Sequence, residues 1–279
     1  MNPEIIIALL CFIFGAITGS FLNVCIVRLP HGKSVVRPRS HCLHCQKTIP
    51  WYDNIPIISY LILTGKCRFC REAFSFRYFL VELITAITFV VFYLYYGLNM
   101  ICFSYLIMVC GFIVATFVDF EHRIIPDEIS VGGMCVGILL SFLIPALQGI
   151  HSDGLWLSFP AHLHALGKSI FGVLIGGGTI YLMGLLGDFI FKKESMGGGD
   201  IKLMAMVGAF MGWKLALLTF FLAPFLGAIY GIVEKIRTKE SAIAYGPFLV
   251  VGALTSLFYG EEIILWVLRG YGLTHINMF

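Results

Sequence analysis

Long stretches without charge dominate this sequence. Residues 5–27 contain no Asp, Glu, Lys or Arg, and similar apolar runs recur to the end of the chain. About 20 mostly apolar residues span the hydrocarbon core of a bilayer as a helix, which satisfies its backbone hydrogen bonds internally. With 59% hydrophobic and 13% charged residues, the chain carries more apolar surface than a water-soluble core of its length can bury. The sequence therefore predicts an all-α polytopic membrane protein.

Gly, Pro and charged residues separate the apolar runs, so we expect about eight transmembrane helices. The first is expected to be retained, because no basic segment precedes it and no convincing cleavage site follows it. The sixth predicted helix is short and polar at its start. The sequence shows no internal repeat. The predicted spans are 5–27, 78–96, 100–118, 129–147, 168–190, 201–211, 214–233 and 245–268.

Basic residues are distributed unevenly between the predicted loops. The positive-inside rule therefore predicts that both termini lie outside. Membrane lipid is the expected surrounding, and no nucleic-acid partner is expected. In this orientation, 16 of the 19 Lys and Arg residues fall in the cytoplasmic segments 28–77, 119–128, 191–202 and 234–244.

Two pairs of cysteines lie in the one sizeable soluble segment, residues 28–77. Cys42 and Cys45 form one C-x2-C pair, and Cys67 and Cys70 form another, with twenty-one residues between the two pairs. This spacing is typical of a four-cysteine zinc site, and a metal would help to fold an insert with little core of its own. Disulfides, which a reducing cytoplasm disfavours, and unliganded thiols are the alternatives. We predict a small zinc-binding cytoplasmic insert.

Two aspartates lie at predicted helix ends on the cytoplasmic side. Asp119 ends the third span, and Asp200 follows three glycines, which allow a sharp backbone break and close approach of a peptide. Carboxylates at such positions indicate function, since two that approach each other can activate water and protonate a leaving amine, as in an aspartic protease. Taken alone, the two aspartates could equally be interfacial anchors or helix N-caps. Asp127, after Pro126, is predicted to be an N-cap.

Eight motifs together resemble the bifunctional type IV prepilin peptidases, a branch of the GxGD membrane aspartyl proteases. The resemblance covers nearly the whole chain and implies that Asp119 and Asp200 are the catalytic pair. It also implies that Cys42, Cys45, Cys67 and Cys70 bind zinc. The motifs lie at residues 19–30, 40–45, 53–56, 65–70, 77–82, 116–127, 196–203 and 245–248.

The resemblance also implies a reaction and a location. Such enzymes lie in the bacterial inner membrane, cut the short basic leader of prepilins and pseudopilins at its cytoplasmic face, and methylate the new N-terminus with S-adenosylmethionine. A glycine-rich motif of the soluble S-adenosylmethionine enzymes is not visible. Asn23, Arg28 and Glu82, polar residues near the insert, are weak candidates for the cofactor site, and they could instead pair with each other.

Three regions follow from this interpretation. They are a first transmembrane helix (1–27), a cysteine insert associated with methyl transfer (28–77) and a transmembrane aspartyl peptidase domain (78–279). Two other functions stay open. A transporter with a regulatory zinc module is disfavoured by the lack of repeated halves, and the cysteine insert argues against a peptidase without methyltransferase activity.

Overall fold

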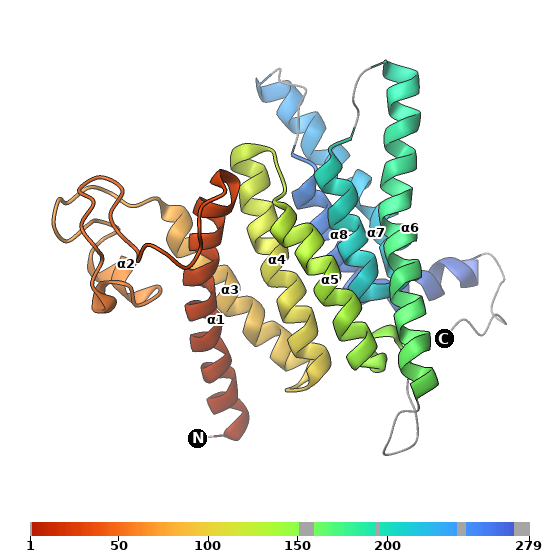
Figure 1. Cartoon of the computed structure of the whole chain (residues 1–279), viewed down its shortest axis with the longest axis horizontal. Helices are drawn as coiled ribbons and strands as arrows, with labels where there is room; N and C mark the ends of the chain where they lie inside the picture. Colours follow the sequence, from red (N-terminus) through yellow and green to blue (C-terminus); the bar gives the residue numbers. More distant parts are fainter. Residues whose placement is uncertain (1, 151–158, 193–195, 239–243, 271–279) are drawn as a thin grey trace. The chain divides into compact units, whose positions relative to one another are not determined.

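The computed structural model describes residues 2–150, 159–192, 196–238 and 244–270. The described residues are mainly helical, which confirms the all-α prediction (Figure 1). Parts of the predicted loops 191–202 and 234–244 lie outside the described residues. The α-helices are α1 (Pro3–Arg28), α2 (Ile58–Ile62), α3 (Phe76–Tyr96), α4 (Met100–His122), α5 (Asp127–Leu143), α6 (Phe159–Phe191), α7 (Gly198–Thr238) and α8 (Gly246–Gly270), with short 3-10 turns at Leu29–His31, Trp51–Asp53 and Pro145–Gln148.

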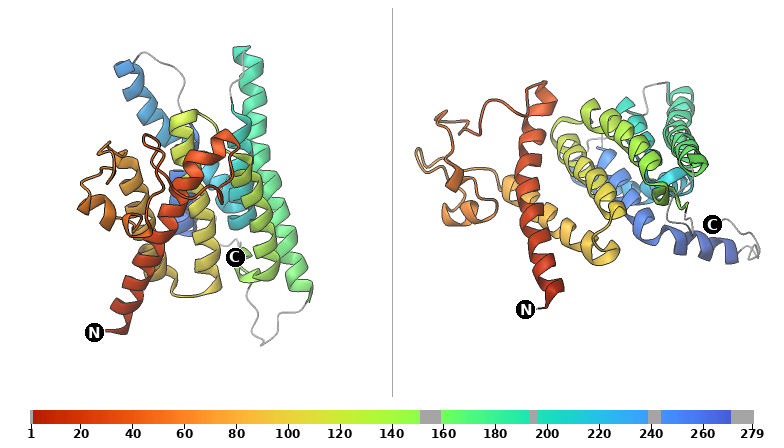
Figure 2. Two further views of the ribbon diagram at one scale, coloured as in Figure 1. Left: turned by 60° about the vertical axis from the view of Figure 1, so that its left-hand side comes forward. Right: turned by 60° about the horizontal axis from the view of Figure 1, so that its bottom comes forward.

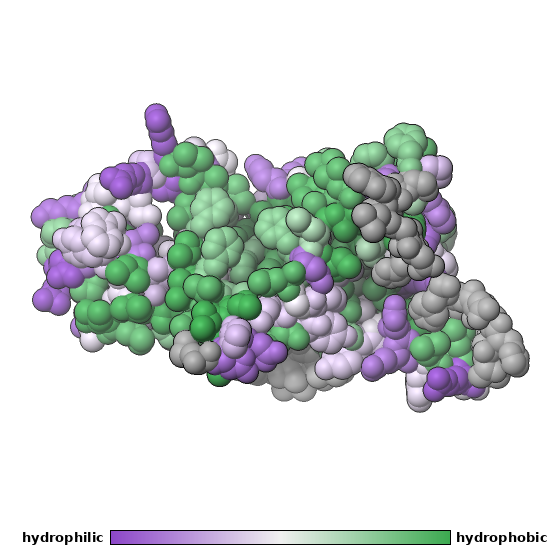
Figure 3. Space-filling model, turned by 90° about the horizontal axis from the view of Figure 1, so that it is seen from below, coloured by the Kyte–Doolittle hydropathy of each residue, from purple (hydrophilic) through white to green (hydrophobic). Residues whose placement is uncertain are grey.

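Six of the described helices are long and apolar enough to cross a membrane, judged by length and composition. They are α1, α3, α4, α6, α7 and α8. The 17 residues of α5 extend over about 26 Å, slightly less than a hydrocarbon core of about 30 Å. Apolar side chains occupy wide areas of the surface (Figure 3). These features fit a multi-pass membrane protein, and the helices match the expected eight spans approximately.

Helix α7 consists of two limbs joined at Gly212, whose φ of 74° and ψ of 174° are not helical. Gly176 of α6 lies against both limbs, because a Cβ added there would be 2.3 Å from Met204 O and 3.5 Å from Ala216 Cβ. In one straight helix, Met204 and Ala216 would be about 18 Å apart along the axis. The chain therefore reverses direction at Gly212, so the separate spans expected at 201–211 and 214–233 are both present.

Buried polar side chains stabilise this reversal. The break leaves carbonyls at the end of the first limb without helical donors. Ala209 O accepts hydrogen bonds from Ser141 Oγ (3.0 Å), Gln148 Nε2 (3.0 Å) and Ser169 Oγ (2.8 Å). Since lipid offers no hydrogen bonds to a backbone carbonyl, these three side chains make a chain reversal possible within an apolar surrounding.

The chain divides into two compact units, Met1–Val118 and Asp119–Phe279. In the first, α1 and α3 run side by side (Figures 1 and 2). A Cβ added at Gly15 would lie 2.8 Å from Ala86 Cα, and one added at Gly19 would lie 2.7 Å from Glu82 Cα. Glycine thus permits close backbone contact along this line, which we call the α1–α3 seam.

In the second unit, α7 packs against both α6 and α8. The first limb of α7 packs against α6, where Gly172 and Gly208 approach so closely that a Cβ on either would meet the backbone of the other. The second limb packs against α8, with Gly252 beside Thr219 and Ala223. This packing brings the start of α7 and the start of α8 to the region of Asp119 and Ile125.

Candidate functional site

Asp119 lies in the last turn of α4, and its side chain is buried. The backbone N–H of Gly246, the first residue of α8, donates to Asp119 Oδ2 over 3.0 Å. A Cβ at position 246 would lie only 2.8 Å from the same oxygen. A glycine is therefore required at the start of α8 for this contact between the carboxylate and the backbone.

Asp200 lies in the first turn of α7, and its backbone N–H donates to Gly197 O over 3.1 Å. The glycines before it do not make the sharp break that the sequence indicated, since no positive φ occurs at residues 197–199. They allow close packing instead. A Cβ at Gly199 would lie 3.0 Å from Ile125 Cβ, and one at Gly197 would lie 3.2 Å from Asp200 Oδ2.

Ile125 links the two aspartates within one unit, because Gly199, next to Asp200, and Gly246, which contacts Asp119, both pack against its side chain. Tyr245 precedes Gly246 in the chain, and burial, together with the negative charge of Asp200, raises the pKa of its phenol to about 12. Two adjacent carboxylates can share a proton, as an acid–base pair requires. The motif at 245–248 is visible in the sequence, but the contact of Gly246 with Asp119 is not. The only local sign of that contact is a glycine before an apolar run.

The N-cap prediction for Asp127 is wrong. The N-cap of α5 is Pro126, and Asp127 is the first helical residue without a side-chain cap bond. Its two carboxylate oxygens accept from Lys202 Nζ at 2.7 and 2.9 Å. A lysine from α7 attracts the carboxylate more strongly than a backbone N–H of its own helix, although the exposed pair contributes only about 0–1 kcal/mol to stability.

The four cysteines of the insert form a cluster whose sulfurs all lie within 4.8 Å of one another. Cys42 Sγ and Cys70 Sγ are 3.8 Å apart. Zinc at about 2.3 Å from each of four tetrahedral sulfurs would place them about 3.8 Å apart, so the cluster is compatible with zinc. All nine cysteines lie in the described residues and none forms a disulfide, which removes the disulfide alternative.

The thiols of this cluster differ in acidity. The backbone N–H of Cys70 is the main cause that lowers the pKa of Cys67 to about 7. The backbone N–H of Glu72 lowers the pKa of Cys70, but burial and hydrogen bonds to the other thiols outweigh it and raise that pKa to about 11. Cys67 therefore ionises before Cys70. Metal binding must release the remaining protons, so acid weakens it.

Each cysteine pair lies on a loop with the same hydrogen bonds. Gln46 N–H donates to Cys42 O over 2.9 Å, and Arg71 N–H donates to Cys67 O over 3.0 Å. Gln46 and Arg71 both have positive φ, 57° and 60°. Each loop is closed by an antiparallel bridge, His41 with Thr48 and Lys66 with Ala73. The two loops are a local structural repeat, although the sequence shows no internal repeat.

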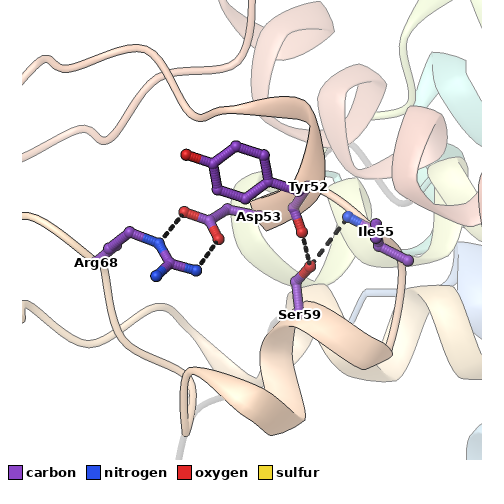
Figure 4. A network of polar contacts seen from close by, with 5 residues as sticks. All are labelled: Tyr52, Asp53, Ile55, Ser59 and Arg68. Atoms are coloured by element: carbon purple, nitrogen blue, oxygen red, sulfur yellow. Dashed lines mark hydrogen bonds and ion pairs between the residues drawn. The ribbon is translucent and has the colours of Figure 1, made fainter.

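A polar network ties the second cysteine loop to the rest of the insert (Figure 4). Arg68 Nε and Nη2 donate to the two oxygens of Asp53 at 2.7 and 2.5 Å, and the guanidinium lies 5.6 Å from the centre of the Tyr52 ring. Ser59 Oγ donates to Tyr52 O and accepts from Ile55 N, both over 3.0 Å. The network therefore fixes the 53–56 motif beside the cysteine cluster.

The three weak candidates for the cofactor site do not pair with one another. Each has separate partners, so the alternative of mutual pairing is wrong. Asn23 Nδ2 donates to Tyr78 O (2.9 Å), Arg28 donates to Ser34 O (2.9 Å) and Pro38 O (2.7 Å), and Glu82 Oε2 accepts from Ile57 N (2.7 Å).

The fold and these sites define a multi-pass membrane protein with an aspartate at each of two helix ends, of which Asp119 is buried, and a four-cysteine insert. Residues 13–96 match the bacterial peptidase A24 N-terminal domain, and residues 106–232 match the type IV leader peptidase family. Residues 97–105, which join α3 to α4 and include the start of α4, separate the two matched regions. The chain belongs to the type IV leader peptidase family.

Three relatives illustrate this membership. The prepilin leader peptidase/N-methyltransferase of Myxococcus xanthus is 34% identical over 84% of this chain and 65% of its own length, which is less than two thirds. The type 4 prepilin-like proteins leader peptide-processing enzyme of Escherichia coli is 31% identical over 88% of this chain and 91% of its own length. The prepilin leader peptidase/N-methyltransferase of Pseudomonas aeruginosa is 30% identical over 91% of both chains. No solved structure matches the chain.

Proposed function

We propose that this protein cleaves the leader peptides of type IV prepilins or pseudopilins and N-methylates the new N-terminal residue. The main structural observation in favour is that the first turn of α7, which carries Asp200, and the start of α8, which contacts Asp119, both pack against Ile125. Family membership and the names of the relatives support the same reaction. They favour a peptidase over a transporter.

Cleavage follows from the paired carboxylates. The ionised aspartate takes a proton from water, and the oxygen of that water attacks the scissile carbonyl carbon. The protonated aspartate gives its proton to the leaving nitrogen as the C–N bond breaks. The hydrogen bond from Gly246 N–H to Asp119 Oδ2 orients the Asp119 carboxyl group for proton transfer. The products are a leader with a free carboxylate and a mature chain with a free amine.

Methylation uses S-adenosylmethionine, which supplies the methyl group for that free amine. We assign this activity to the N-terminal region, because the match to the A24 N-terminal domain covers residues 13–96, including the insert. Cys42, Cys45, Cys67 and Cys70 would hold zinc, and their role would be to fold the insert. The presence of this region favours the bifunctional enzyme over a peptidase alone.

We place the aspartate pair at the cytoplasmic face of the bacterial inner membrane. The reason is the distribution of charge, since 16 of 19 basic residues fall on the side of the chain that carries Asp119 and Asp200. A basic leader exposed in the cytoplasm reaches the site in this orientation. Lipid surrounds the exposed apolar faces of the helices.

The decisive experiment weighs the products of one prepilin incubated with the membrane-reconstituted protein, with and without S-adenosylmethionine. Loss of the leader mass identifies the peptidase, and the further mass of a methyl group identifies the transferase. Asp119→Asn and Asp200→Asn should each nearly abolish cleavage, because an amide cannot exchange the proton. Asp127→Asn is the matched control, expected to cleave normally. Normal cleavage by Asp119→Asn would contradict the assignment.

A further inference from the structure

Glu82 is a carboxylate inside the first unit, on α3, and only 9% of its surface is exposed. Its described partners are neutral, namely the backbone N–H of Ile57 at 2.7 Å and the hydroxyl of Ser20. No ion pair joins it to a Lys, Arg or His of the described residues. A buried carboxylate without a cation is costly, so Glu82 has an unused capacity to bind a positive group.

Asn23 of α1 offers a second buried acceptor. It is 3% exposed, and its Nδ2 donates to Tyr78 O. Its Oδ1 is buried and receives no hydrogen bond from any described residue. Leaving a buried amide oxygen unsatisfied is unfavourable, so this oxygen requires a donor that the described part of the chain does not supply.

The two acceptors lie on adjacent turns of the α1–α3 seam. Gly19 packs against the backbone of Glu82, and Ser20 beside it hydrogen-bonds the Glu82 side chain. Asn23 follows Ser20 by three residues, so both lie on one helix face. It contacts Tyr78, one turn before Glu82 on α3. Both acceptors therefore face the same stretch of the seam, at the end that joins the cysteine insert.

The backbone of the insert holds Glu82 in place through a strained residue. Ile57 has φ 65° and ψ −55°, and Ile58 N donates to Pro56 O over 2.6 Å, which is a γ-turn of the rare, strained kind. Positive φ is an outlier for a β-branched residue, and such strain persists where the surroundings over-determine it. Here Glu82 accepts the N–H of Ile57, so the carboxylate has a fixed position.

We propose that Asn23 and Glu82 form a binding site for a primary ammonium group. Such a group brings a positive charge for the carboxylate and three N–H donors, one of which can satisfy Asn23 Oδ1. The proposed function, on which this inference rests for its ligands, supplies two sources, the new N-terminal amine of the cut substrate and the α-ammonium of S-adenosylmethionine. Both residues lie within about 9 Å of a helix end by the rise per residue, so either source can reach them.

The test measures binding by calorimetry with the full-length protein in lipid nanodiscs. The probes are S-adenosylmethionine, 5′-deoxy-5′-methylthioadenosine, which lacks the ammonium, a mature N-terminal peptide, and the same peptide with its amine acetylated. The variant is Glu82→Gln, which keeps an acceptor for Ile57 N–H and removes the charge. Glu72→Gln is the matched control, because Glu72 is an exposed glutamate of the cysteine insert. Zinc content and thermal unfolding report whether each variant is folded.

We expect Glu82→Gln to weaken binding of one ammonium probe on the order of tenfold to hundredfold, as the loss of a charged hydrogen bond predicts. Its non-ammonium counterpart and the Glu72→Gln control should be unaffected. An effect on S-adenosylmethionine identifies the cofactor as the source, and an effect on the free peptide identifies the substrate amine. Equal affinities of wild type and a folded Glu82→Gln for both ammonium probes would overturn the proposal. Wild-type leader cleavage tests the proposed function separately, because ammonium binding does not require cleavage.

Discussion

Replacing Gly246 with alanine tests whether the start of α8 positions Asp119. The position has no positive φ, so an alanine backbone is allowed there and the effect is steric. The new Cβ would lie 2.8 Å from Asp119 Oδ2 and 3.3 Å from Ile125 Cδ1. Ordinary contacts begin at 3.4 Å, so the carboxylate oxygen must move by about 0.6 Å, on a scale where 1 Å of misplacement can cost 10²-fold in rate.

We therefore expect Gly246→Ala to slow leader cleavage on the order of tenfold to a hundredfold. The assay is the initial rate of conversion of a prepilin in nanodiscs, followed by product mass. Gly132→Ala, in α5, is the matched control, because a Cβ there has no atom within 4 Å and cleavage should stay normal. Thermal unfolding shows whether the variants remain folded. Cleavage by folded Gly246→Ala within twofold of wild type would refute the positioning role of this contact.

Two further predictions concern the metal and the fold. Cys42→Ser should lose zinc and methylation but largely retain cleavage, since the aspartate pair belongs to the other unit. Metal analysis and product mass check this prediction, with Cys135→Ser as the control variant. Zinc retained in the double variant Cys42→Ser/Cys67→Ser would contradict the prediction. Gln148→Leu should lower the free energy of unfolding by about 0.5–1.5 kcal/mol, because it removes one of the three donors to the buried carbonyl of Ala209. Thermal melts against Thr88→Val, which removes a hydroxyl bonded within its own helix, measure the effect. Equal melting temperatures of both variants would count against the hydrogen-bond account.

The cysteine insert and the close packing of α1 with α3 show how far local patterns extend. The C-x2-C spacing predicted a four-cysteine site, and the structure brings the four sulfurs within 4.8 Å of one another on two loops with the same hydrogen bonds. It did not reveal the strained turn at Ile57 or its bond to Glu82, twenty-five residues away. A positive φ at isoleucine has no local sequence signal, because it depends on a distant carboxylate.

The aspartate site divides in the same way. Apolar runs, charges and glycines were sufficient to place Asp119 and Asp200 at helix ends, since helix formation in a membrane depends on local composition. The tertiary structure alone decided that Gly246 N–H donates to Asp119, that Lys202 pairs with Asp127, and that the chain reverses at Gly212. These contacts join residues far apart in sequence, and they depend on which surfaces pack closely enough to exclude a side chain, which no local pattern encodes.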